Sequence, residues 1–147
     1  MKAILMNELA GYIFRNNPDL LFSLQAEGGM QAYLENKVDA LGEMPMSLLD
    51  ETYPIYLIRE RCMAELTADL LPSRYNYLLD IVETEFSEEA EMMRESGVLV
   101  YEVVNLVRKC AGLLVDDFEN DRMLHYAIVG IVQEYREESW HSLSGKN

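Results

Sequence analysis

The sequence predicts an all-α protein, a single-domain bundle of six or seven helices. Three observations favour this fold class. Apolar residues recur at spacings of three and four along most of the chain, with no convincing strand-like alternation. Only four prolines and eight glycines interrupt the 147 residues. Half of the residues are hydrophobic and 26% are charged, a composition typical of a globular domain.

The first part of the chain is expected to form three helices, separated by proline and glycine. The first covers about residues 4–15 and ends before Pro18. Pro18 suits the first position of the second helix, because that position needs no backbone N–H, and Asn17 can cap it. The second helix ends near Gly28, and the third covers about residues 30–41.

Proline also limits the middle of the chain. A helix begins at Ser47, and Pro54 either kinks it or opens a new helix, an alternative that the sequence leaves open. Apolar residues then continue at helical spacing as far as Leu70, and Pro72 ends this helix. Ser73 is the natural cap of the helix that follows.

The helix after Ser73 starts with a clear apolar stripe and continues through the acidic sequence SEEAEMMRES to Gly97. The next run, residues 98–115, is apolar on nearly every side. A helix of this kind is typical of the middle of a bundle, so we expect a nearly all-apolar central helix there. A turn over 116–121 and a last helix over about 121–140 complete the bundle.

One domain is therefore expected over residues 1–141, followed by a flexible C-terminal tail over 142–147. The apolar start of the chain is too short for the core of a signal peptide, and no run is long enough to span a membrane. Cys62 and Cys110 each lie on an apolar side of a predicted helix. This position is typical of buried, reduced thiols in cytosolic proteins. We expect a cytoplasmic protein without a disulfide.

Charge is the most unusual property of the sequence. Acidic residues number 26 and basic residues 12, which gives a net charge of −14. Such a surface repels phosphate, so we expect no direct contact with nucleic acid, and a basic protein as the partner. Nine tyrosines and the apolar run at 98–115 also leave a homo-oligomer open.

Six glutamates make residues 83–95 the densest acidic segment. They are Glu83, Glu85, Glu88, Glu89, Glu91 and Glu95. One interpretation is a face that binds a basic partner, or that imitates the charge of DNA. The other is a solvated helix face, since charge runs on exposed helices are common.

Catalytic and metal-binding residues are not expected. Glu138 and His141 form one Glu-x-x-His pair, whereas a two-metal site in a helical bundle needs two such pairs and further glutamates. The other histidine, His125, has the cation Arg122 three positions before it. We therefore expect no metal and no cofactor. The alternative is a metal-binding or enzymatic bundle that uses carboxylates with His141 or His125.

Residues 73–86 resemble a motif of a small, uncharacterised, all-helical family of Bacteroides-type bacteria. The motif is Ser-x-Tyr-x-x-Leu, a branched apolar pair and Glu-Phe, here Ser73, Tyr75, Leu78, Ile81, Val82, Glu85 and Phe86. The pair Ala64-Glu65 and the sequence LAGYIFRNNPDLL are also similar to that family. The resemblance implies a multi-helical fold, no known catalysis, and genes often near mobile elements. We accordingly expect a non-enzymatic interaction module with an accessory or regulatory role in a bacterium.

Overall fold

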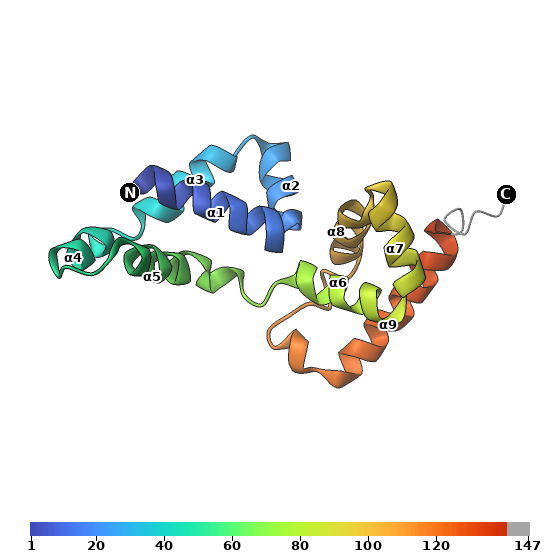
Figure 1. The fold of residues 1–147 in the computed structure, drawn as a ribbon. Helices are drawn as coiled ribbons and strands as arrows, with labels where there is room; N and C mark the ends of the chain where they lie inside the picture. The colour runs from blue at the N-terminus through green and yellow to red at the C-terminus, as the bar shows by residue number, and fades with distance from the viewer. Residues whose placement is uncertain (141–147) are drawn as a thin grey trace. The chain divides into compact units, whose positions relative to one another are not determined.

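The computed structural model describes residues 1–140, and every regular element in this part of the chain is a helix (Figure 1). The α-helices are α1 Lys2–Asn16, α2 Pro18–Glu27, α3 Met30–Asp39, α4 Met44–Asp50, α5 Ile55–Thr67, α6 Arg74–Glu85, α7 Ser87–Ser96, α8 Leu99–Lys109 and α9 Arg122–Ser139. Two short 3-10 helices, η1 (Ala68–Leu70) and η2 (Phe118–Asn120), join them. The all-α class is confirmed, but the described residues form nine α-helices rather than six or seven.

The helices group into two compact units, Met1–Leu71 and a second that begins at Pro72. One domain over residues 1–141 stays a prediction, and the tail predicted at 142–147 lies outside the described residues. Within residues 1–140, no helix combines the length and the apolar character that crossing a membrane requires.

Two interruptions between helices explain the higher number. The sequence left the first one open, at Pro54, and did not predict the second one, at Phe86. Pro54 has an extended backbone (φ −63°, ψ 149°), so it opens α5 instead of kinking one long helix. The predicted helix over residues 74–96 is interrupted at Phe86, whose φ of −133° and ψ of 50° end α6 and begin α7. Phe86 is 4% exposed, and its ring meets that of Trp140 edge-on, with 6.4 Å between centroids. We attribute the break to this packing, since the sequence around Phe86 is helix-forming.

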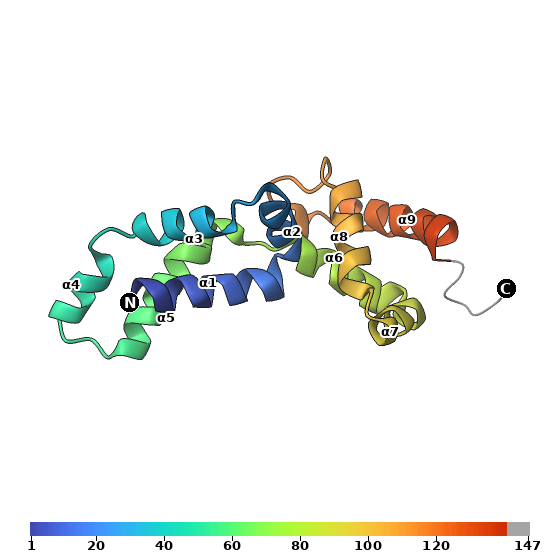
Figure 2. The same cartoon turned by 90° about the horizontal axis from the view of Figure 1, so that it is seen from above.

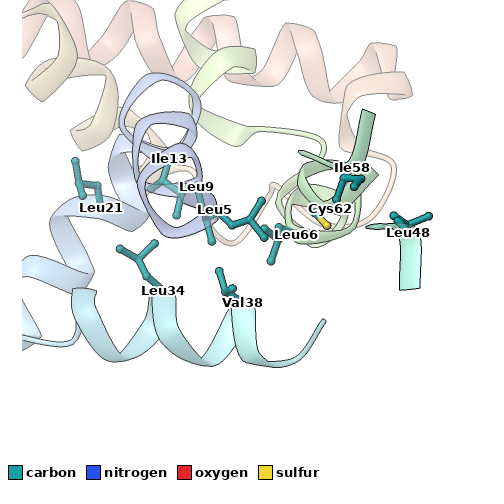
Figure 3. Packing of buried hydrophobic residues seen from close by; sticks show 10 residues of the cluster. All are labelled: Leu5, Leu9, Ile13, Leu21, Leu34, Val38, Leu48, Ile58, Cys62 and Leu66. Carbon is teal, nitrogen blue, oxygen red and sulfur yellow. The ribbon is translucent and has the colours of Figure 1, made fainter. Parts of the chain in front are cut away.

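Helix α1 is the centre of the first unit, because it contacts α2, α3 and α5. Its buried residues follow a spacing of four, which places them on one side of the helix. They pack with buried residues of the neighbouring helices to form the core in Figure 3: Leu5, Leu9, Ile13, Leu21, Leu34, Val38, Leu48, Ile58, Cys62 and Leu66. Helix α4 packs on α5, at the end of the unit away from α2 (Figure 1, Figure 2).

The junction of α1 and α2 was predicted correctly in one respect. Pro18 occupies the start of α2, but the side chain of Asn17 makes no capping hydrogen bond there. Its Nδ2 instead donates to the carbonyl oxygen of Leu70, 3.5 Å away. Asn17 therefore holds the start of α2 to the end of η1.

In the second unit, α6, α7 and α8 all contact one another, and α9 packs on α6. Two side-chain caps fix where helices begin. The Ser73 hydroxyl accepts from the Asn76 N–H (3.0 Å), as predicted, and the Asp121 carboxylate accepts from the Leu124 N–H (3.0 Å). Each cap satisfies an N–H group that the first turn of a helix leaves free.

The apolar run at 98–115 does not form one central, all-apolar helix. Helix α8 ends at Lys109, and Val100 and Tyr101 on its outer side are 40% and 58% exposed. Beyond Lys109 the chain turns and buries Leu114, while Val115 is 62% exposed. Two different structures share the apolar residues of this run. The first part forms α8, which buries one face, and the second part forms a turn that buries Leu114 in the core.

Candidate functional site

The six glutamates predicted to bind a partner lie at the end of α6 and along α7. Glu83 and Glu85 belong to α6, and the other four, Glu88, Glu89, Glu91 and Glu95, belong to α7. We call these six residues the acidic segment. All are exposed except Glu89, which is half-buried. Glu88, Glu91 and Glu95 follow a spacing of three and four, so they share one side of α7.

Arg94 brings the two helices of the acidic segment together. Its guanidinium pairs with Glu83 of α6 and, at 3.1 Å, with Glu91 of α7. The Arg94 side chain is 48% exposed and that of Glu91 is 64% exposed. Exposed pairs of this kind contribute about 0–1 kcal/mol, so another cation can replace Arg94 at little cost.

Arg136 gives Glu89 a different environment. Its Nη1 lies 3.3 Å from a carboxylate oxygen of Glu89, which links α9 to α7. The guanidinium carbon also lies over the ring of Phe86, 5.7 Å from its centroid. Both charged side chains are partly buried, so this pair belongs to the packing of the unit.

Glu85, Glu88 and Glu95 have no ion-pair partner within 4 Å in the described part of the chain. Six carboxylates against the two guanidinium groups of Arg94 and Arg136 leave a local charge of −4. The acidic segment thus combines one structural carboxylate, two that share an exposed arginine, and three that face solvent.

Sequence reasoning missed a polar cluster around Glu102. One oxygen of this carboxylate accepts from the Tyr135 hydroxyl at 3.0 Å and from the Trp140 indole N–H at 2.9 Å. The rings of Tyr135 and Trp140 also meet edge-on, 5.6 Å apart. Burial, and then the bond to Glu102, raise the pKa of Tyr135 above its ordinary value. The available signal was an acid inside an apolar run, and in the structure this acid is a half-buried acceptor.

The histidines do not form a metal site in the described residues. His125 is half-buried against the ring of Tyr126 and lines a pocket of about 370 Å³ with Glu119, Asp121 and Arg122. Within residues 1–140, no three His, Cys, Asp or Glu side chains gather as metal ligands would. Glu138 is exposed, and its predicted partner His141 lies outside the described residues.

The two cysteines are free and buried, one in each unit. Burial raises the pKa of the Cys62 thiol and of the Cys110 thiol. A catalytic cysteine needs the opposite shift, because the thiolate is the nucleophile. These side chains therefore act as small apolar residues of the core.

No protein-family model, curated protein or solved structure matches the chain. The described residues form an all-α chain whose densest run of acids lies at the end of α6 and along α7.

Proposed function

We propose that the protein is a non-enzymatic interaction module with an accessory or regulatory role, and that the acidic segment binds a basic partner protein. The observation that supports this is the local charge of −4 on exposed helices. Glu85, Glu88 and Glu95 carry three of these charges without an ion-pair partner in the described residues.

The arrangement suits a cationic surface in two ways. Glu88, Glu91 and Glu95 lie about 5–6 Å apart along one side of a helix, a spacing that successive lysine or arginine side chains can match. The net charge of −14 adds a long-range field, which raises the rate at which a basic protein meets this surface. Binding should therefore weaken as salt screens the charges.

A sharper version of the proposal is a protein that imitates the charge of DNA and occupies a DNA-binding protein. The chain itself would then contact no nucleic acid, in keeping with its acidity. The family resemblance adds a bacterial setting near mobile elements. We also propose a cytoplasmic location, since Cys62 and Cys110 are free, buried thiols.

The test compares two variants with the same change in charge. One carries Glu85→Gln, Glu88→Gln and Glu95→Gln. The control carries Glu27→Gln, Glu43→Gln and Glu51→Gln, three exposed acids of the first unit. Both raise the net charge by three, but only the first changes the acidic segment.

Partners are captured from a native lysate on each purified protein and eluted with rising salt. We expect the first variant to lose a basic partner at lower salt, with an affinity reduced about tenfold, or by about 1.4 kcal/mol. The control should elute like the wild type. Equal elution of the two variants would show that only net charge matters, and the proposal would fail.

A further inference from the structure

The solvent side of α9 carries a continuous stripe with two halves of different chemistry. Its N-terminal half is apolar or small, and its C-terminal half is acidic. The stripe residues are Met123, Tyr126, Ala127, Gly130, Glu134, Glu137 and Glu138, all exposed. Spacings of three and four make the residues neighbours on one side of the helix. We call this surface the α9 stripe.

The apolar half is well exposed. Met123 is 79% exposed and Tyr126 is 66% exposed. The buried residues of α9, Ile128 and Val132, point to the opposite side, where the helix packs on α6. A side chain at Gly130 would meet nothing within 4 Å, so the space above the stripe is free for another backbone.

We infer that the α9 stripe docks one amphipathic helix of a partner protein. An apolar half of that helix covers Met123 and Tyr126, and a basic half faces Glu134, Glu137 and Glu138. These three acids have no ion-pair partner within 4 Å in the described residues, and Glu137 receives only a 3.4 Å hydrogen bond from Gln133, so their charge is available to a basic partner. The inference shares with the proposed function only the positive charge of the partner.

The shape of the stripe favours a helix as its occupant. From Met123 to Glu138 it runs about 22 Å, four turns of a helix. Small residues at Ala127 and Gly130 permit a close approach of two helices, and methionine and tyrosine are enriched at interfaces. A second copy of the chain suits it less well, because each copy brings a net charge of −14 and three acids on the same stripe.

The probe is a labelled synthetic helix of about 15 residues, with leucines at helical spacing in one half and lysines in the other. A second peptide replaces the lysines by glutamates. Binding to the full-length protein is measured by fluorescence anisotropy at several salt concentrations. The variant Met123→Ser, Tyr126→Ser is compared with Met46→Ser, Tyr56→Ser, since Met46 and Tyr56 are 61% and 70% exposed in the first unit.

The lysine peptide should bind the wild type and the Met46/Tyr56 control equally, and the Met123/Tyr126 variant at least about tenfold more weakly. The triple change Glu134→Gln, Glu137→Gln, Glu138→Gln should weaken binding by a similar factor and reduce its dependence on salt. The glutamate peptide should not bind.

Equal affinity for the two serine variants would overturn the inference, as would binding of the glutamate peptide. A dimer in sedimentation that the Met123/Tyr126 change abolishes would also overturn it, because a second copy would then cover the stripe. The acidic-segment variant separates the two proposals. If the acidic-segment variant loses its lysate partner while the α9 variants keep the peptide, the proposed function stands and the α9 inference falls. If the α9 variants lose the peptide while the acidic-segment variant keeps its partner, the α9 inference stands and the proposed function falls.

Discussion

Replacing Glu102 by alanine should destabilise the second unit by about 2–4 kcal/mol. The change removes a single acceptor that serves two donors, the hydroxyl of Tyr135 and the indole N–H of Trp140. Tyr135 lies in the C-terminal half of α9 and Trp140 directly follows that helix, whereas Glu102 lies on α8. The variant therefore tests how strongly these two helices are joined.

The two donors contribute unequally to this figure. Trp140 is 3% exposed, so water cannot replace the lost acceptor, and a buried unsatisfied donor costs about 1–3 kcal/mol. Tyr135 is only half-buried, so water can reach its hydroxyl once Glu102 is removed. Its loss therefore lies near the usual net value of about 0.5–1.5 kcal/mol.

Urea unfolding followed by tryptophan fluorescence measures the effect, because Trp140 is the only tryptophan and lies in the second unit. With a slope of about 1–3 kcal/mol per molar urea, the midpoint should fall by about 1–2 M. Glu102→Gln is the matched control, since its amide oxygen still accepts both bonds, and it should lose less than half as much. If the alanine variant unfolds within about 0.5 kcal/mol of wild type, the bonds to Glu102 do not hold α9 in place.

Two further predictions concern the backbone and pH. Thr52 has a φ of 60°, in the left-handed region that β-branched residues avoid. Thr52→Gly should therefore stabilise the first unit by about 0.5–1 kcal/mol. Thermal unfolding followed by circular dichroism measures this change, and a lower melting temperature would contradict the prediction. Burial raises the pKa of Cys62, Cys110 and Tyr135 above ordinary values of 9.0 for the thiols and 10.0 for the phenol. Below those values each group is protonated whether the chain is folded or not; above them the unfolded chain loses its protons first. Stability should therefore fall as pH rises past about 9, and a constant urea midpoint up to pH 11 would contradict the cause given.

The limits of many helices could be predicted from sequence because they depend on local chemistry. Pro18 begins α2, the hydroxyl of Ser73 caps α6, and Gly97 ends α7 with a φ of 80°. Each of these effects is complete within a few residues of the chain. They hold whatever the rest of the molecule does.

The errors arose where distant packing decides the local conformation. Nothing near Phe86 forbids a continuous helix, yet its ring packs against Trp140, 54 positions further on, and the chain breaks there. The run at 98–115 was similarly misjudged. Apolar residues in a turn such as Leu114 look the same in sequence as apolar residues in a helix.

The acidic segment shows the same division. Arg94 and Glu91 are three residues apart on one helix, so their pairing could be predicted from the sequence. The pairing of Arg136 with Glu89 joins residues 47 positions apart, so only the structure identifies Glu89 as a residue that holds α7 to α9. Sequence located the charge, and the fold determines which carboxylates remain free for a partner.

The fluorescence of Trp140 should distinguish binding at the acidic segment from binding at the α9 stripe. Arg136 pairs with Glu89, lies over the ring of Phe86, and Phe86 in turn contacts Trp140. Glu85 and Glu88 flank Phe86 in the sequence, so a cationic partner bound to them should change the fluorescence of Trp140 through the Phe86 ring. The stripe at Met123 lies on the side of α9 away from its buried residues, and a helix docked there leaves these contacts in place. One optical signal from the only tryptophan can therefore tell which of the two surfaces a basic ligand occupies.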